Sequence, residues 1–303
     1  MNRQTIAEQI LGNISWQTND KGFCECPGTH LHTNKTGKRA CVVYLDTIKP
    51  PTIFCCHTSC EGFVAEANAK LRSAIGKENP PTEDYRKSPQ YQKKLEEQRR
   101  RLELETRART SLPKVLKENE WSEKEAWHES PIQSQDVESD WRLLLTIFPN
   151  DGLIWIGHQF DSGKPEHQNN FKTREEWLKQ DKPMGPLTSP SLYKPGSFSR
   201  SNQNVLARPF LVVESDILTR DQTCSIFKWL RKFMRLRAIV FSGGKSLHGY
   251  FDYPSLTVLA QLEVMLPVMG CDPALFRASQ PARLSGVKRE DKWQSLVWFG
   301  GAA

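Results

Sequence analysis

Six of the chain's eight cysteines fall between positions 24 and 60, together with three of its seven histidines. This cluster constrains the N-terminal part of the chain strongly, because a segment so short builds only a small core without added cross-links. In a reducing compartment, clustered Cys and His residues indicate a metal site rather than disulfides. We therefore expect a small metal-binding domain over residues 1–76.

Two ligand-rich segments, 23–33 and 54–60, suit one tetrahedral zinc ion with sulfur and nitrogen ligands. A basic stretch and an apolar run, 40–45, lie between them, as in a zinc ribbon. The cluster resembles the Cys-Pro…His…Cys…Cys zinc ribbon found in front of many primases. That resemblance favours a structural zinc, because four protein ligands leave no open position for catalysis. The expected ligands are Cys26, His32, Cys55 and Cys60, with His30 as the alternative to His32, Cys56 as the alternative to Cys55, and Cys24, Cys41 and His57 as non-ligands.

Residues 77–135 form a highly charged segment without a continuous apolar stripe. We expect a solvated helical linker there; a nucleic-acid-binding arm is the alternative. The formal charge of +7, from 42 Lys and Arg against 35 acidic residues, permits nucleic-acid binding without demanding it. No apolar run reaches the length of a membrane span, and no signal-peptide pattern is present, so a cytoplasmic protein without a membrane partner is expected.

Residues 136–303 read as a folded α+β domain. Apolar runs at 209–214, 238–241, 247–252 and 294–299 predict strands. A capping-box spacing at 219–222 predicts the start of one helix, and leucines spaced for burial predict a second helix over 255–266. The order β-α-β-β-α-β is that of ferredoxin-like and RNA-recognition-motif-like domains. Fold alone does not define function.

Glu214 and Asp216 stand one residue apart at the end of an apolar strand. Because residues i and i+2 of a strand share a face, both carboxylates are expected to converge. Their mutual repulsion raises their pKa values unless a cation lies between them, and Mg²⁺ or Mn²⁺ prefers such oxygen ligands. A pair of solvated turn acids is the alternative interpretation.

A glycine turn joins the next two expected strands, and the second of these strands, 247–252, carries a histidine. Gly243 and Gly244 let backbone N–H groups approach an anion, and Lys245 adds a positive charge that suits a triphosphate. His248 then begins a strand, where a purely structural histidine is the alternative. The run lacks the spacing of a Walker loop. Asp272 offers a third carboxylate, and three carboxylates suit two metals that clamp the attacking hydroxyl and the leaving pyrophosphate.

This ordered set resembles the archaeo-eukaryotic primase superfamily, most closely the primase–polymerases of phages, plasmids and mobile elements. The resemblance covers residues 205–299, through Val213-Glu-Ser-Asp216, Ser246-Leu-His248, Cys271-Asp272 and Arg283-Leu-Ser-Gly286. It implies that Glu214, Asp216 and Asp272 bind the two catalytic ions. It also implies that His248, with Lys245 and Ser246, contacts the nucleotide phosphates, and that Arg283 faces the nucleotide. This chain departs from the usual pattern with Glu in the first acidic position and Ser in the Arg-Leu-Ser-Gly run.

The resemblance implies a DNA-dependent nucleotidyltransferase, a primase or primase–polymerase. Its expected partners are single-stranded DNA, NTPs or dNTPs and, because a Walker loop is absent, a separately encoded replicative helicase. Two alternatives belong to other classes. A catalytically inactive, zinc-containing replication-associated DNA-binding protein would keep the fold and lose synthesis. A metal-dependent nuclease would use similar acids and a histidine for hydrolysis.

Overall fold

A computed structural model of the chain describes residues 2–32, 41–45, 50–78 and 87–301. The chain divides into two compact units, Met1–Glu96 and Glu97–Ala303. The basic stretch between the two ligand-rich segments, and part of the segment expected to be a linker, lie outside the described residues. Among the helices that the structure describes, none is long and apolar enough to cross a membrane.

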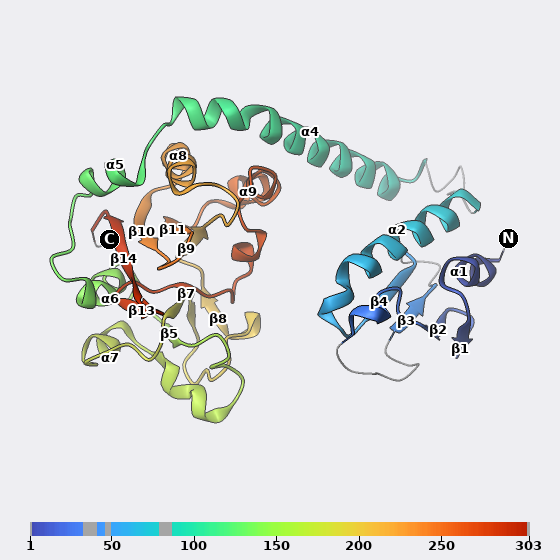
Figure 1. Cartoon of the computed structure of the whole chain (residues 1–303), viewed down its shortest axis with the longest axis horizontal. Coiled ribbons are helices and arrows are strands. Elements are labelled where there is room, and N and C mark those ends of the chain that lie inside the picture. Colours follow the sequence, from blue (N-terminus) through green and yellow to red (C-terminus); the bar gives the residue numbers. More distant parts are fainter. Residues whose placement is uncertain (1, 33–40, 46–49, 79–86, 302–303) are drawn as a thin grey trace. The chain divides into compact units, whose positions relative to one another are not determined.

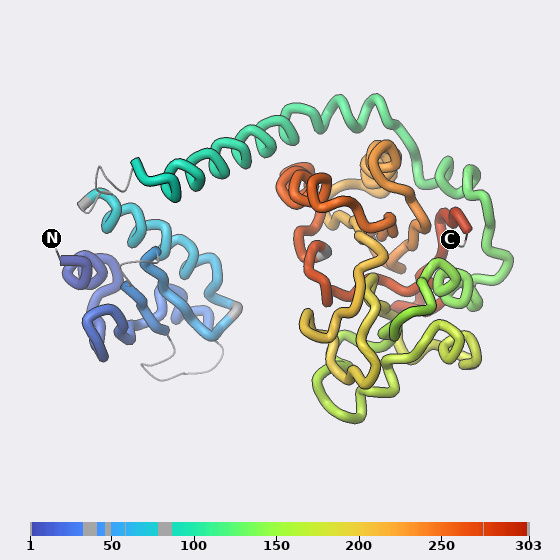
Figure 2. Tube along the Cα trace, turned by 180° about the vertical axis from the view of Figure 1, so that it is seen from behind, coloured from blue at the N-terminus to red at the C-terminus, as the bar shows by residue number. Residues whose placement is uncertain are grey.

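In the residues that the structure describes, the N-terminal unit packs a four-stranded antiparallel sheet with helices α1 and α2, coloured blue to cyan in Figures 1 and 2. Its core joins alternate strand residues such as Val43 and Ile53 to the helix residues Ile6 and Leu71. The expected zinc-ribbon domain is thus built around one sheet face. Its elements are α1 (Arg3–Leu11), β1 (Ile14–Trp16), β2 (Lys21–Cys24), β3 (Cys41–Tyr44), β4 (Thr52–Cys55) and α2 (Glu61–Glu78).

A long helix, α4 (Pro89–Glu118), leads into the C-terminal unit, and α5 (Glu123–His128) follows it. One face of the second half of α4 is not solvated: Ala108 and Val115 are buried in the same core cluster as residues of α8 and the main sheet, and Leu104 packs against that cluster. The expectation of a solvated linker over 77–135 is therefore wrong for this half. The apolar positions recur every three to four residues, but charged residues between them obscure the stripe.

The main sheet of the C-terminal unit has the strand order β13-β14-β10-β11-β9. β9 and β10 run parallel with β11 between them, since both pair antiparallel with β11, and β14 joins the far edge of β10. The expected α+β class is confirmed, but not the ferredoxin-like arrangement, because β14 borders β10 whereas the last strand of a ferredoxin-like domain borders the first. Along the chain the elements follow the expected β-α-β-β-α-β order, with β13 as an additional strand. They are β9 (Phe210–Val213), α8 (Arg220–Leu230), β10 (Leu236–Phe241), β11 (Leu247–Asp252), α9 (Leu256–Val268), β13 (Val287–Arg289) and β14 (Lys292–Phe299).

The two faces of the main sheet bury different cores. Leu211, Val213 and Phe251 point to α8 and α9, which cover one face (Figure 1). The intervening residues Val212 and Tyr250 point to the opposite face, against a second sheet. Alternation along each strand therefore sandwiches the main sheet between a helical layer and another sheet.

The second sheet has the order β12-β7-β5-β6, with β8 paired to β7. Ile154 of β5 and Leu192 of β7 join the core shared with the main sheet. This layer comes mostly from residues upstream of β9. Its elements, with the helices beside them, are α6 (Asp140–Leu145), β5 (Leu153–Gly157), β6 (Phe171–Lys172), α7 (Arg174–Leu178), β7 (Leu187–Tyr193), β8 (Val205–Ala207) and β12 (Ala282–Arg283).

Candidate metal centre and candidate active site

Four side chains of the N-terminal unit form the candidate metal centre: Cys26, His32, Cys55 and Cys60. Cys55 ends β4, and Cys60 ends the short 3-10 turn that leads into α2. Cys26 follows β2, and His32 follows a second 3-10 turn. Their ligand atoms all lie within 4.8 Å of one another. The sequence-based set is the one that the fold brings together.

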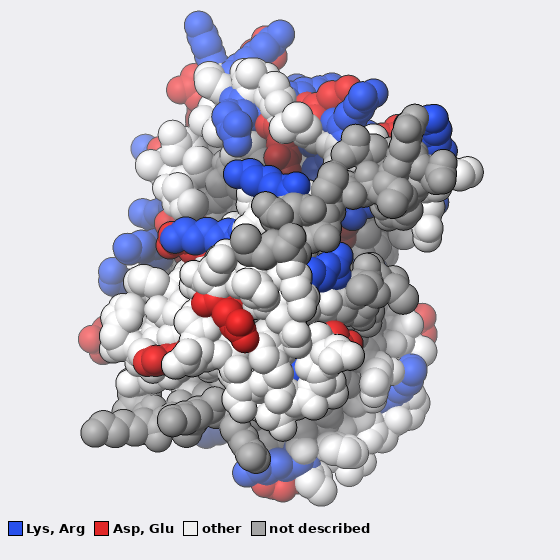
Figure 3. Space-filling view, turned by 90° about the vertical axis from the view of Figure 1, so that its right-hand side faces the viewer, with Lys and Arg blue, Asp and Glu red and all other residues white. Residues whose placement is uncertain are grey.

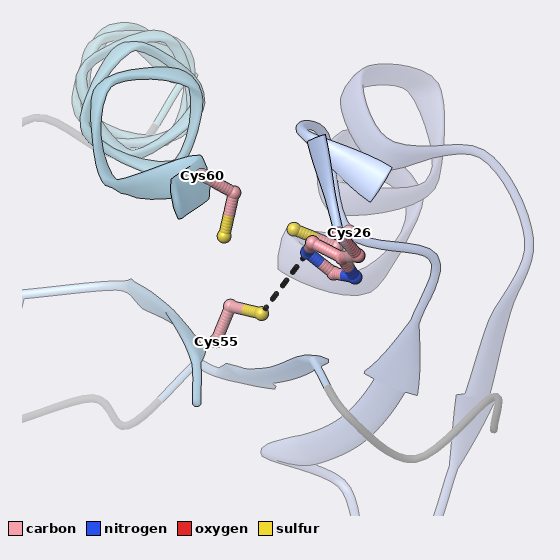
Figure 4. Close-up of side chains that lie close together, drawn as sticks. Cys26, Cys55 and Cys60 are labelled. Atoms are coloured by element: carbon pink, nitrogen blue, oxygen red, sulfur yellow. Dashed lines mark hydrogen bonds between the residues drawn. The ribbon is translucent and has the colours of Figure 1, made fainter. Parts of the chain in front are cut away.

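The geometry suits a tetrahedral zinc ion. Nε2 of His32 lies 3.7 Å from Sγ of Cys55, and Figure 4 shows the thiols of Cys26, Cys55 and Cys60 pointing toward one another. With Zn–S and Zn–N bonds of about 2.3 and 2.0 Å, a tetrahedron has an S–N edge of about 3.5 Å. Three thiols and one imidazole are the donors of a closed, structural zinc site.

The pKa values of the thiols differ within the cluster. Burial alone would raise the pKa of Cys55, but hydrogen bonds to the backbone and ring of His57 lower it to about 7. Burial and the neighbouring thiols raise the pKa of Cys60 to about 12. Deprotonating three adjacent thiols therefore costs free energy that a bound cation offsets.

The remaining Cys and His residues of the cluster lie around the four. The ring of His57 stacks on His32 with centroids 4.0 Å apart, and its Nδ1 lies 3.3 Å from Sγ of Cys55. Cys24 and Cys41 are buried against each other, with sulfurs 3.7 Å apart. His57, Cys56 and Cys55 form a second, overlapping cluster, so Cys56 stays the alternative ligand.

In the C-terminal unit, Glu214 and His248 face each other across the end of two paired strands. Val213 pairs with Gly249, so the register places Glu214 opposite His248 one residue further on. Nε2 of His248 lies 2.7 Å from Oε2 of Glu214, and both side chains are largely buried. Because directly opposed residues share a face, both point to the side of the second sheet. An acid and an imidazole thus meet between the two sheets.

The pKa of Glu214 is shifted in the direction opposite to the expectation. Burial alone would raise the pKa of this carboxyl, but the charge and contact of His248, the Ser246 hydroxyl and the charge of Arg283 more than offset it. Its pKa is therefore lowered. The expected rise through repulsion between two converging carboxylates is wrong for Glu214, because its neighbours are donors and cations.

The turn between β10 and β11 is organised by Ser242. Its hydroxyl oxygen accepts hydrogen bonds from the backbone N–H groups of Gly244 and Ser246, at 3.3 and 3.2 Å. Gly243 has a φ of 70°, a conformation that favours glycine. Ser246 donates from its hydroxyl to Glu214 at 3.4 Å, while Lys245 is exposed at the tip of the turn. The turn thus connects to the acid–imidazole pair.

Asp216 and Asp272 lie in loops that adjoin Glu214. β9 ends at Val213, so Asp216 falls in the following loop and is exposed. Asp272 is joined to Glu214 through the backbone, by an N–H···O bond of 2.9 Å, and its carboxylate accepts a hydrogen bond from the N–H of Ala274. Among the described residues of this unit, no three acidic, imidazole or thiol groups place ligand atoms within 4.8 Å of one another.

The hard oxygen ligands at 214, 216 and 272 still have the chemistry that Mg²⁺ or Mn²⁺ prefers. Of these carboxylates, Glu214 and Asp216 both lie near the positive charge of Arg283. The expected joining of all three carboxylates into one cluster is not a feature of this structure. The fold alone therefore does not bring the three carboxylates together as ligands of one ion.

Arg283 extends the candidate site from the second sheet. The hydroxyl of Tyr250 donates to the Arg283 carbonyl at 2.8 Å and so ties β11 to β12. Burial lowers the pKa of Arg283, and the nearby positive charge of Arg289 lowers it further, while Glu214 and Asp216 act in the opposite direction. Two guanidinium groups beside two carboxylates can bind an anion and a cation at neighbouring positions.

The sequence predicted no specific role for three residues of this site. Ser242 orders the glycine turn, Tyr250 joins the two sheets, and Arg289 lies with its Nη1 about 3.1 Å from the position that a Gly244 Cβ would occupy. Tyr250 shares a strand face with His248, as the period of two along a strand predicts. The place of Arg289 depends on the pairing of β13 with β14, which only the fold reveals.

Comparisons with known proteins add no relative: no family model, no curated protein and no solved structure matches this chain.

Proposed function

We propose that the chain is a DNA-dependent nucleotidyltransferase, a primase or primase–polymerase, that extends a strand on a single-stranded template with two divalent ions. The observation that supports this best is the acid–imidazole pair of Glu214 and His248. It lies beside a glycine turn with Lys245, and Arg283 adds its charge from the second sheet. An acid, an imidazole and several cations thus occur together at one end of the main sheet.

The proposed roles follow from charge and position. Lys245, Arg283 and His248 are placed to bind the triphosphate through charge-assisted hydrogen bonds. Glu214 and Asp216, with Asp272 after a rearrangement, would hold the ions. When bound, these ions supply charge stabilisation for in-line displacement at phosphorus. Glu214 also holds the His248 ring in place, at 2.7 Å.

The fold is compatible with the resemblance to the archaeo-eukaryotic primase superfamily. The parallel β9 and β10 enclose β11, as in a split β-α-β unit. β14 borders β10, which leaves β9 at the sheet edge with its C-terminal loop accessible. The N-terminal unit would then present a zinc-stabilised surface to template DNA.

The direct test is incorporation of labelled NTPs or dNTPs on a single-stranded template with Mg²⁺ or Mn²⁺. Under the proposal, synthesis depends on the divalent ion and is lost in Asp216→Ala. The exposure of Asp216 makes this variant informative, because its removal leaves the core intact. Full synthesis by Asp216→Ala would contradict the proposed active site.

One observation favours a second candidate, a zinc-containing DNA-binding protein without synthesis. The three carboxylates do not form one cluster among the described residues. On the face shown in Figure 3, Lys and Arg side chains lie among acidic and uncharged residues rather than forming one continuous basic field. This candidate predicts salt-dependent DNA binding without incorporation under any metal condition.

A further inference from the structure

A separate pocket of about 300 Å³ opens in the C-terminal unit. It is lined by three segments: one after β5, one between β7 and β8, and one before β12. Its chemistry combines an aromatic ring, two guanidinium groups and two amides. The residues that carry the argument are Gln159, Phe160, Arg200, Arg277, Ser279 and Gln280. None of the residues that line it is acidic.

Phe160 stands out on the wall of this pocket, because 84% of its surface is exposed. The turn that carries it is closed by hydrogen bonds between His158 and Asp161: an N–H···carboxylate bond of 2.7 Å and a backbone bond of 3.1 Å. The Trp155 indole N–H also donates to the Asp161 carbonyl, at 3.0 Å. The exposed ring is therefore presented by a fixed turn, which lowers the entropic cost of stacking on it.

Arg200 is fixed at the base of the pocket. Its guanidinium packs over the Trp155 ring at 4.4 Å. It donates one hydrogen bond to the Ser279 carbonyl and one to the Gln159 carbonyl, at 3.2 and 2.8 Å. Each terminal nitrogen of a guanidinium carries two hydrogens, so these bonds leave donors for a ligand. Burial lowers the pKa of Arg200, and the charge of Asp161 acts in the opposite direction.

The pocket is linked to the candidate active site through the chain. The segment that contains Arg277 and Gln280 continues directly into β12, which carries Arg283. The Ser191 hydroxyl of β7 donates to the Ala278 carbonyl at 2.6 Å and anchors this segment to the second sheet. A strand that leaves the active site along β12 would meet this pocket.

We infer that this pocket binds one nucleotide of a single-stranded nucleic acid, with the base stacked on Phe160 and the phosphate on Arg200 and Arg277. Stacking suits any base, and the side-chain amides of Gln159 and Gln280 offer donors and acceptors to its edge. The absence of an acidic lining residue suits the phosphate. The inference rests on the proposed function only in assigning this strand as the template.

The test is fluorescence anisotropy of a labelled oligo-dT with the full-length protein, without nucleotide or divalent ion. Phe160→Ala should weaken binding by about five- to hundredfold, the typical cost of losing one stacked base, and Phe160→Trp should restore it. Arg277→Gln should lower the slope of log affinity against log salt by about 0.7, for one lost phosphate contact on a single strand.

A chemically matched pocket elsewhere in the same unit provides the control. It contains Phe233 and Arg235, and it lies where β10 begins, at the opposite end of this strand from the glycine turn. Phe233→Ala and Arg235→Gln should leave affinity and salt slope unchanged. Equal losses in the two pockets would overturn the inference, because they would indicate non-specific binding to a basic surface.

Unchanged oligo-dT affinity in Phe160→Ala would also overturn it. If the same variant binds ATP more weakly, the pocket is assigned to a free nucleotide instead. If Phe160→Ala loses oligo-dT binding and the wild-type protein incorporates no nucleotide, this pocket is supported and the proposed function is contradicted. If the wild-type protein incorporates nucleotides and Phe160→Ala binds oligo-dT as tightly as the wild type, the proposed function is supported and this pocket is contradicted.

Discussion

Glu214 lies one residue beyond the last pair of β9 and β11 and meets His248 across the strands, with 2.7 Å between Oε2 and Nε2. The sequence predicts a separate role for each residue: Glu214 binds a metal ion, and His248 contacts the nucleotide phosphates. Their contact couples those tasks, since the carboxylate that would hold an ion also orients the imidazole. A change in either residue must therefore act on both.

The first prediction separates catalysis from stability among the acids. Glu214→Ala and Asp216→Ala should both abolish incorporation, but only Glu214→Ala should lower the free energy of unfolding. Removing a buried carboxylate that pairs with His248 costs about 3 kcal/mol, whereas an exposed residue such as Asp216 costs less than about 0.5 kcal/mol. Urea denaturation followed by fluorescence measures this difference. Equal destabilisation by both variants would contradict the structure at this site.

The second prediction concerns pH. The pKa of Glu214 lies below its ordinary value of 4.5 in the folded protein, so the unfolded chain binds more protons in this range. The stability that Glu214 contributes is complete above pH 4.5 and is lost as the pH falls through the lowered pKa. Urea midpoints between pH 3 and pH 7 should therefore converge for the wild type and Glu214→Gln at low pH. A constant difference across that range would refute the pair's role.

The third prediction concerns zinc. The purified chain should contain one zinc ion, and Cys60→Ala should lose it and unfold the N-terminal unit, because structural zinc contributes about 10–16 kcal/mol to folding. The C-terminal unit has separate core clusters and should melt unchanged. Metal analysis and calorimetry measure both effects.

The matched control is Cys56→Ala, an exposed neighbour of the ligand Cys55. It should keep the metal. Loss of zinc in this variant would show that Cys56, rather than Cys55, is the ligand. Wild-type protein with well under one zinc per chain, purified without chelators, would remove the metal centre altogether.

The fourth prediction tests the packing of α4. Val115 is 8% exposed and belongs to the core of the C-terminal unit, whereas Leu102 on the same helix is 64% exposed. Val115→Ala should lower the stability of this unit by about 2 kcal/mol, and Leu102→Ala should change it by less than about 0.5 kcal/mol. Thermal denaturation of the full chain provides the measurement. Equal, small effects of both variants would show that α4 does not pack on the core of the C-terminal unit.

Local patterns predicted much of the main sheet and its helices. The expected strand at 247–252 matches β11, and the capping box at Thr219 forms as its spacing indicated. These features depend on neighbours within a few residues, where period and capping chemistry act directly. The zinc ligands were identifiable for a similar reason, because short Cys and His spacings restrict which donors can converge.

Other features depend on contacts between distant parts of the chain. The packing of α4 on the core joins residues about a hundred positions apart, which no local period reveals. The second sheet places Arg283 beside Glu214, and it is built largely upstream of β9.

The sequence by itself determined the four Cys and His residues of the candidate metal centre, the strand and helix types of the main sheet and the candidate acids, because those depend on residue chemistry and local periodicity. Only the tertiary structure decided that Glu214 pairs with His248, that Asp216 is exposed and that the Asp272 carboxylate accepts a hydrogen bond from the N–H of Ala274. The physical reason is strand register. Pairing Val213 with Gly249 determines which side chains meet, and a register is a property of two strands rather than of either sequence alone.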